Sequence, residues 1–188
     1  MSDRAYIAID IETTGTDPET CQILEIGAVI VDPELKVMSC PVFNEIVDPI
    51  KDDGMLHGSS YALAMNQHLL DHIATNNCLS VDQGVDRMMD WVAHWQEVMG
   101  VDEFHPLGKN VGSFDIPFLK RVPSWRQDFF HYRCLEVGSM YATPEGIDGQ
   151  AELIKQIELA YDIPGDEHTA VHDARVSLAL ARWKWSND

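Results

Sequence analysis

The first third of the chain contains three short apolar or alternating segments that are typical of strands in a sheet. Residues Tyr6–Ile11 alternate and then run apolar up to the turn at Thr13–Gly15. The segment Ile23–Val31 is rich in β-branched residues and is followed by Asp32-Pro33, which predicts a second strand that ends in a hairpin-like turn. We expect Val37–Val47 to return as a third strand.

The middle of the chain changes to helical spacing. After a loop at Pro49–Gly58, helices are predicted at Tyr61–Ile73 and Val81–Met99. In the second of these, apolar residues recur at steps of three and four: Val81, Val85, Met88, Val92 and Trp95. Such a stripe is typical of a helix that packs on a core.

The last part of the chain predicts two more strands and three helices. The strands are His105–Val111 and His131–Val137, and the helices are Asp115–Arg121, Ala151–Tyr161 and Ala170–Trp185. This order of elements predicts the α/β class, with a mixed sheet and helices on its faces. A chain of 188 residues is expected to form one domain over residues 1–188.

The composition indicates where in the cell the protein is expected. No stretch approaches the roughly 18 consecutive apolar residues of a membrane span, and the start MSDRAYIAID has no secretory pattern. The four cysteines, Cys21, Cys40, Cys78 and Cys134, form no C-x-x-C pair and are expected to be free thiols. We therefore expect a cytoplasmic protein without a membrane partner.

The charge argues against a broad nucleic-acid-binding face. Thirty-one acidic and 13 basic residues give a net charge of −18, the wrong sign for wrapping a polyphosphate. Within residues 109–133, however, five basic residues stand against two acidic ones, a local balance of +3: Lys109, Lys120, Arg121, Arg126 and Arg133. A small basic rim that grips one chain end and chance clustering on a solvated surface explain this excess equally well.

Two carboxylates on the first predicted strand suggest a metal site. Asp10 and Glu12 are two residues apart, so their side chains point to the same face. Adjacent carboxylates repel, and a fold usually tolerates them through a bound cation. Oxygen ligands suit Mg²⁺ or Mn²⁺ rather than zinc. Asp115 and Asp173 each open a predicted helix, where an acid alone is explained by capping or by the helix dipole.

Three segments taken together resemble the motifs of the DEDDh family of 3′→5′ exonucleases, which includes proofreading subunits of DNA polymerases, RNase T and oligoribonuclease. They are DIETTG at Asp10–Gly15, NVGSFDIPFL at Asn110–Leu119 and HTAVHDA at His168–Ala174. The motifs occur in the order of the family and span residues 10–173. The resemblance implies a ribonuclease H-like fold, a mixed five-stranded sheet with helices on both faces.

The resemblance also implies roles for five residues. Two Mg²⁺ or Mn²⁺ ions would be held by four acids, Asp10, Glu12, Asp115 and Asp173. Such ions stabilise the attacking water and the leaving 3′ oxygen. His168 would take the proton of the water, because an imidazole exchanges protons near neutral pH. A sister branch of the family has Tyr four residues before the last acid, and Thr169 at that position favours the His branch.

Further correspondences with the family imply contacts with the substrate. Thr13 and Thr14 occupy positions at which members of the family contact the terminal nucleotide. Asn110 matches an Asn that stabilises the loop before the third acid. His57, in MLHGSS, resembles a His-Gly pair that some members place over the scissile end. Glu25 also matches the family, but a strand Glu that faces a helix N-terminus or solvent explains it equally well. His172 has the wrong spacing for a base and is expected at the surface or in packing.

These observations predict an enzyme that cuts single-stranded DNA or RNA from 3′ ends and releases nucleoside 5′-monophosphates. Unpaired ends are expected because a deep two-metal site must thread a single strand, with Phe114 or Trp125 stacking on bases. The sequence does not distinguish DNA from RNA as the substrate, because a single contact to a 2′-hydroxyl would decide between them.

Two further questions stay open at this point. The net charge of −18 favours the alternative of a catalytically idle module of the same fold that binds nucleic acid or another partner, although all five catalytic positions are filled. Some members of the family form homodimers in which the second subunit supplies a basic surface. The acidic composition makes such a homodimer attractive for this chain.

Overall fold

The computed structural model describes residues 5–32, 36–141, 151–163 and 168–187, and a five-stranded sheet lies at its centre. The strand order is β3-β2-β1-β4-β5. Pairing is antiparallel among β1 (Ala5–Thr13), β2 (Ile23–Val31) and β3 (Val42–Ile46), whereas β4 (Phe104–Gly108) and β5 (Leu135–Glu136) extend the sheet in parallel from β1. The expectation of a mixed five-stranded sheet is confirmed.

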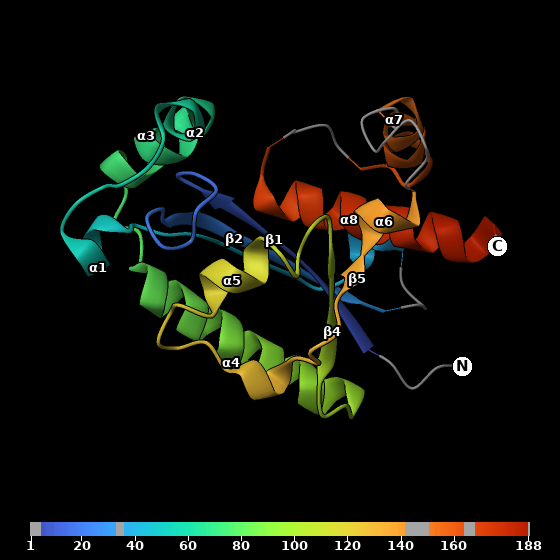
Figure 1. Cartoon of the computed structure of the whole chain (residues 1–188). Helices are drawn as coiled ribbons and strands as arrows, with labels where there is room; N and C mark the ends of the chain where they lie inside the picture. Colours follow the sequence, from blue (N-terminus) through green and yellow to red (C-terminus); the bar gives the residue numbers. More distant parts are fainter. Residues whose placement is uncertain (1–4, 33–35, 142–150, 164–167, 188) are drawn as a thin grey trace.

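Helices cover both faces of this sheet (Figure 1). The main helices are α4 (Val81–Met99), α5 (Asp115–Leu119), α7 (Ala151–Ala160) and α8 (Ala170–Asn187), with the single turn α6 (Val137–Met140) after β5. Ile7 and Ile9 of β1 point into the core beneath α4, whereas Ala8 between them belongs to the core beneath α8. The alternation of β1 therefore divides the interior into two layers of packing.

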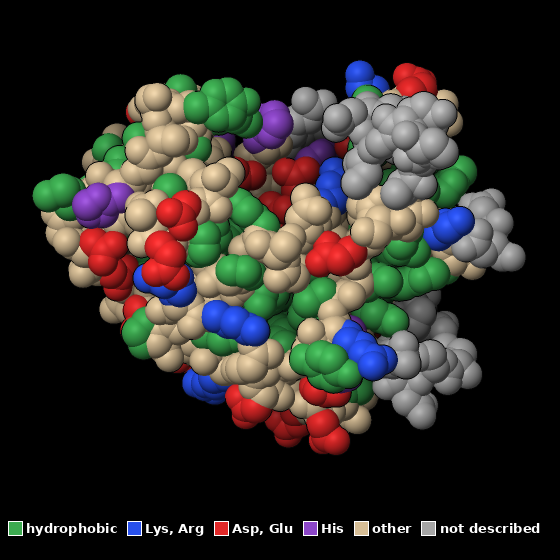
Figure 2. Space-filling model, in the orientation of Figure 1, with side chains coloured by type: hydrophobic (Ala, Val, Ile, Leu, Met, Phe, Trp, Pro, Cys, Tyr) green, Lys and Arg blue, Asp and Glu red, His purple; other side chains and the backbone are tan. Residues whose placement is uncertain are grey.

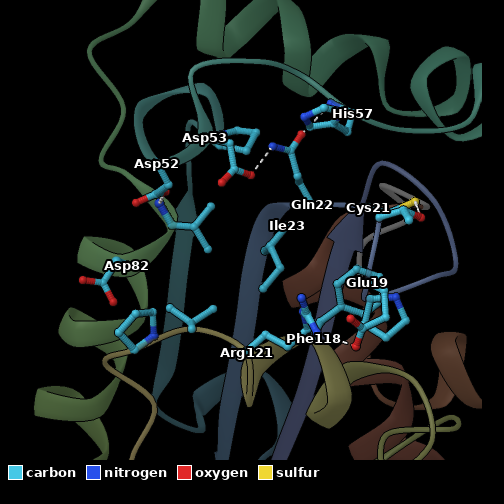
Figure 3. Close-up of a pocket in the computed structure, with 16 residues that line it drawn as sticks. Glu19, Cys21, Gln22, Ile23, Asp52, Asp53, His57, Asp82, Phe118 and Arg121 are labelled. Carbon is cyan, nitrogen blue, oxygen red and sulfur yellow. Dashed lines mark hydrogen bonds and ion pairs between the residues drawn. The ribbon is translucent and has the colours of Figure 1, made fainter.

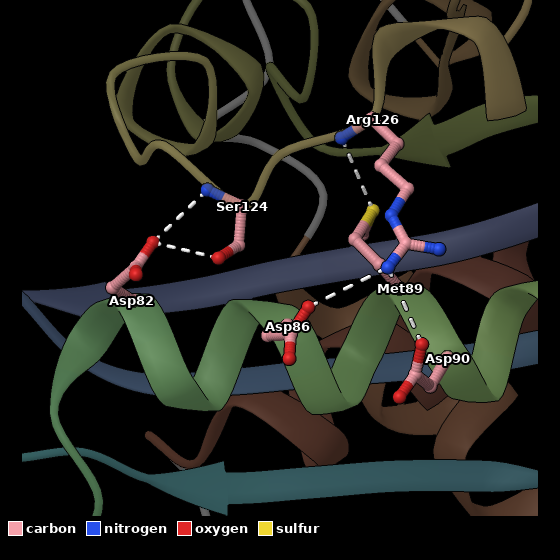
Figure 4. Close-up of polar contacts among 6 residues, drawn as sticks. All are labelled: Asp82, Asp86, Met89, Asp90, Ser124 and Arg126. Atoms are coloured by element: carbon pink, nitrogen blue, oxygen red, sulfur yellow. Dashed lines mark hydrogen bonds and ion pairs between the residues drawn. The ribbon is translucent and has the colours of Figure 1, made fainter.

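Polar contacts hold the segment after α5 against α4. Asp82 accepts hydrogen bonds from the backbone N–H of Ser124 at 2.9 Å and from its hydroxyl at 2.8 Å (Figure 4). The Arg126 guanidinium lies 3.5 Å from a carboxylate oxygen of Asp86 and 3.4 Å from one of Asp90. The acidic side chains on the outer side of α4 therefore bind the segment that follows α5.

The first turn of α8 lies directly on β2. A Cβ atom at Gly27 would come within 2.6 Å of the Val171 backbone nitrogen, so only glycine permits this approach. Glu25, on the same face of β2, accepts the backbone N–H of Ala170 through Oε2 at 3.0 Å. Of the two explanations for Glu25, the structure supports the one in which it faces a helix N-terminus.

Several predicted bounds were wrong near polar or proline residues. Only Val42–Ile46 of the predicted third strand pairs in the sheet, because a 3₁₀ turn at Val37–Ser39 precedes it. The strand predicted to run to Val111 ends at Gly108, before Asn110 adopts a left-handed backbone with φ of 60°. Of the predicted strand His131–Val137, only Leu135–Glu136 pairs.

The predicted loop and the helix after it also differ from the structure. The loop contains the single turn α1 (Ile50–Asp53). The helix predicted at Tyr61–Ile73 is divided at Asn66 into α2 (Ser60–Met65) and α3 (Gln67–Thr75). Asn66 turns its side chain inward, where Nδ2 donates to the Thr13 carbonyl at 3.0 Å. A tertiary hydrogen bond therefore overrides local helical spacing.

We expect Gly27→Ala to lower the free energy of unfolding by about 3 kcal/mol or more, the upper range for overpacking against backbone. A suitable comparison is Gly54→Ala, where a Cβ would meet open space and only the φ of 73° opposes it, at about 1 kcal/mol. Urea unfolding of both variants measures the difference. Equal losses would mean that the start of α8 does not depend on close approach to β2.

Candidate active site

Three acids from two elements meet at the end of β1. Asp10 and Glu12 lie on the face of β1 covered by α8, and Asp173 lies in the first turn of α8. Each offers a carboxylate oxygen, and these three atoms all lie within 4.8 Å of one another. Figure 2 shows acidic side chains gathered in a hollow between the α2–α3 pair and α8. The predicted convergence of these three residues is thus present.

Strand register explains why the acids meet. Asp10 pairs with Gly27 across the β1–β2 ladder, and Glu12 pairs with Glu25. Because Gly27 lets α8 approach and Glu25 holds the N–H of Ala170, the first turn of α8 is brought over Asp10 and Glu12. The helix thereby adds its own acid to the pair on the strand.

Asp115 lies beside this group without being part of the 4.8 Å cluster. It opens α5, is 2% exposed, and accepts the backbone N–H of Ile11 through Oδ1 at 2.9 Å. One carboxylate oxygen thus joins α5 to the last part of β1. The charge of Asp115 is close enough to raise the pKa of Asp10.

Burial sets the electrostatics of the site. Loss of water raises the pKa of Asp10 well above its ordinary value, and the charges of Asp115 and Asp173 raise it further. Burial likewise raises the pKa of Glu12 to about 7 and that of Asp115 to about 7. A set of hard oxygen donors that resists carrying negative charge fits a divalent metal ion, which would offset the repulsion.

Lys109 is the positive residue that opposes this trend at Asp10. It follows the end of β4, the parallel neighbour of β1, and its charge lowers the pKa of Asp10. Other members of the basic segment have different partners: Arg121 pairs with Glu19, and Arg126 lies near Asp86 and Asp90. Neighbouring acids therefore neutralise part of the positive charge of this basic segment.

The two histidines of the last motif have different environments. His168 is exposed and has a left-handed backbone with φ of 70°, two residues before α8 begins. His172 is 6% exposed, and its Nε2 lies 3.7 Å from Oε1 of Glu158 on α7. His172 is accordingly a packing residue, one of the two places expected for it.

A cavity of about 700 Å³ adjoins Glu12. Its wall includes Thr13, His57, Asn66 and Phe114. The Phe114 ring packs 5.3 Å from that of Phe118 and remains part of the wall.

Trp125 differs from the other aromatic candidate, Phe114. It stacks on Phe130 at 4.4 Å with an angle of 6° between the rings, and it does not line the cavity beside Glu12. Of the two aromatic candidates, Phe114 is thus the one beside the carboxylates.

The hydroxyls of the two threonines serve the turn after β1. Thr13 Oγ1 donates to the Gly15 carbonyl at 2.7 Å, and Thr14 Oγ1 accepts the Gln22 N–H at 2.8 Å. Asn110 stabilises the loop before Asp115 through its carbonyl, which accepts the Phe114 N–H at 2.8 Å. Contacts of Thr13, Thr14 and Asn110 with substrate stay predictions.

Asn66 is a site residue that sequence reasoning missed. It is 4% exposed, donates to the Thr13 carbonyl, and forms a side-chain hydrogen bond that lowers the pKa of Glu12. None of the described residues donates to its Oδ1. The available signal was an amide of low helix propensity within the predicted helix Tyr61–Ile73.

Comparison with known proteins gives consistent matches. The family model of the 3′-5′ exoribonuclease Rv2179c-like domain matches residues 5–185. The oligoribonuclease of Vibrio parahaemolyticus is 26% identical over 188 residues, which cover 97% of this chain and 94% of the relative. That of Baumannia cicadellinicola is 31% identical over 140 residues, covering 71% and 70% of the two chains.

Solved structures share the fold. A moderately thermophilic Exonuclease I from Methylocaldum szegediense matches 98% of this chain with a TM-score of 0.66 and 17% identity. E. coli Exonuclease I in complex with a dT13 oligonucleotide matches 96% with a TM-score of 0.58 and 14% identity. This chain spans 41% of the length of each of those proteins. The expected ribonuclease H-like fold is confirmed.

The raised pKa values predict how stability depends on pH. Glu12 and Asp115 have ordinary pKa values of 4.5 and 3.8 and values of about 7 in the folded protein. The unfolded chain therefore loses these protons first, and without metal the folding free energy becomes less favourable as pH rises from about 4 to about 7. Thermal unfolding in chelator should show this loss, and Glu12→Gln should show less of it.

Divalent metal should reverse the loss at pH 7.5. Ion at 100 times its Kd adds about 2.7 kcal/mol, or on the order of 5–10 °C in Tm for a chain of this size. Asp10→Ala should gain much less, because it lacks one of the converging carboxylates. Equal gains in Tm for the two proteins would mean that the acids do not form a shared metal site.

Proposed function

The chain belongs to the 3′-5′ exoribonuclease Rv2179c-like family, and from this premise we propose a two-metal mechanism for its 3′→5′ exonuclease activity. The proposed reaction is hydrolysis of the terminal phosphodiester bond of single-stranded RNA, with release of a nucleoside 5′-monophosphate. The observation that carries the proposal is the meeting of Asp10, Glu12 and Asp173 within 4.8 Å, with buried Asp115 beside them.

In this proposal four carboxylates hold the metal: Asp10, Glu12, Asp115 and Asp173. Two divalent ions in such a site supply Lewis acidity to the scissile phosphate and a nucleophile derived from water. Mg²⁺ and Mn²⁺ suit the all-oxygen donor set. Asp115 accepts the backbone N–H of Ile11, which fixes the orientation of that carboxylate, and Asn66 lowers the pKa of Glu12.

His168 is proposed to take the proton of the attacking water. Its exposure leaves the imidazole open to solvent and substrate, and its position five residues before Asp173 ties it to the turn that carries the acid. The left-handed backbone at His168 changes the chain direction immediately before α8. Histidine is the most common general base in enzymes because its imidazole can exchange a proton near neutral pH.

The cavity beside Glu12 is proposed to receive the terminal nucleotide. Its volume of about 700 Å³ and its mixed wall of Phe114, His57 and backbone suit a base and a sugar. RNA is preferred in this proposal because the family is described as exoribonucleases and the relatives as oligoribonucleases. DNA is the alternative substrate to test.

Assembly and location stay predictions. No helix of the described segments is long and apolar enough to span a membrane. In a homodimer a second copy would supply a basic surface beside the carboxylate site, and sedimentation analysis tests whether the chain forms a dimer.

Digestion should begin at a free 3′ end. A 5′-labelled RNA strand should shorten in single-nucleotide steps, and a covalently closed RNA circle should survive conditions that erase its linear counterpart. Asp115→Asn should abolish activity on the linear strand and keep a cooperative unfolding transition, because the amide oxygen still accepts the Ile11 N–H. Rapid cutting of the circle would identify an endonuclease and refute the proposal.

Removal of the proposed base should slow chemistry while leaving metal binding intact. We expect His168→Ala to lower kcat by about 10²–10⁴-fold, the usual contribution of a general base. The Mn²⁺-dependent rise in Tm should remain. The control is His172→Ala, which alters a buried packing contact with Glu158 and should leave kcat nearly unchanged. The reverse ranking of the two variants would overturn the assignment of His168.

A further inference from the structure

Gln22, immediately before β2, is a buried amide that bridges two segments of the chain. It is 8% exposed. Its Nε2 donates to Asp53 Oδ2 at 2.7 Å and to the Met55 carbonyl at 3.0 Å, and its Oε1 accepts the backbone N–H of His57 at 2.7 Å. Figure 3 shows the side chain of Gln22 between Asp53 and His57, with an interaction on each side.

The backbone of Gln22 is itself fixed to the turn after β1. Its N–H donates to Thr14 Oγ1 at 2.8 Å, and its carbonyl accepts the Thr14 N–H at 2.9 Å. The Thr14 carbonyl in turn accepts the N–H of Ser59 at 2.8 Å. At Gly58 a Cβ would lie 2.5 Å from that of Thr14. Residues 55–59 are therefore pressed onto a turn that begins just beyond Glu12.

His57 lies at the boundary between two cavities. It lines the cavity beside Glu12 and also a second one of about 810 Å³, and the two cavities share Thr20 and Cys21 of the β1–β2 turn. The second cavity is lined by Asp52, Asp53, Asp82 and Arg121 and does not include any of the clustered carboxylates, whereas the first includes Glu12. In the proposed mechanism the terminal phosphodiester lies at those carboxylates, so the strand would meet His57 from the cavity that holds Phe114 and Asn66.

We propose that Gln22 is a positioning residue that holds His57 in the wall of the carboxylate cavity, where the imidazole contacts the terminal nucleotide. This inference rests on the proposed function. Only an amide meets the requirement at this position, because it accepts from one N–H and donates to two oxygens at once. A carboxylate would lose both donors and would face Asp53, and an aliphatic side chain would leave three polar groups without their partner.

A double-mutant cycle tests the proposal with a short 5′-labelled oligoribonucleotide in the presence of Mn²⁺. We expect Gln22→Met and His57→Ala each to raise KM on the order of tenfold, the effect of losing one polar contact, with a smaller change in kcat. The double variant should have the KM of His57→Ala alone, because Gln22 acts through His57. The Mn²⁺-dependent rise in Tm should be the same in all four proteins.

The control is Gln96→Met, the same substitution at a glutamine whose Nε2 donates to the Asp102 carbonyl at 2.7 Å, at the far end of α4. It should leave KM unchanged. If Gln22→Met does not fold, Asp53→Ala removes one anchor of the amide and should raise KM only when His57 is present.

The outcomes separate this inference from the proposed function. Independent, multiplicative increases in KM for Gln22 and His57 variants would show that Gln22 does not act through His57 and would overturn the inference alone. An unchanged KM in His57→Ala would also overturn it. A wild-type protein without exonuclease activity would overturn the proposed function and this inference together.

Discussion

The close contact between the first turn of α8 and Gly27 of β2 is the constraint on which the site depends. A side chain at Gly27 would displace the helix, and with it Asp173, from the two acids on β1. Glu25 reinforces the contact by binding the N–H of Ala170. The geometry of the carboxylate cluster therefore originates in backbone packing between a strand and a helix, because Asp10 pairs directly with Gly27 across the β1–β2 ladder.

The same contact brings several carboxyl groups together where water is scarce. Burial raises the pKa values of Asp10, Glu12 and Asp115, so the folded chain resists ionising the groups that a cation needs. Backbone and amide hydrogen bonds to Asp115 and Glu12 offset part of that cost. If the cluster binds a divalent ion, as we propose, it lowers the stability of the metal-free protein in return for affinity toward that ion, because function and folding place opposite demands on the same residues.

Local sequence predicted those features that depend on periodicity and on motif order. The bounds of β2 and α4 agree with their apolar patterns, and the spacing of Asp10 and Glu12 placed both on one face. Long-range hydrogen bonds decided the rest. Asn66 ends a helix because its amide reaches Thr13, and Gln22 holds a segment 35 residues away. No window of neighbouring residues contains that information, so neither amide was found from the sequence.

The pairing of Arg121 with Glu19 and of Arg126 with Asp86 and Asp90 has a consequence for how long a strand stays bound. Arginines already neutralised within the chain displace few counterions from nucleic acid, so ionic strength changes affinity only weakly. In the proposed mechanism, binding would then depend mainly on contacts with the terminal nucleotide and with the phosphate at the carboxylate site. Few contacts would retain the rest of the strand after that nucleotide leaves, so we expect the enzyme to dissociate between successive cuts.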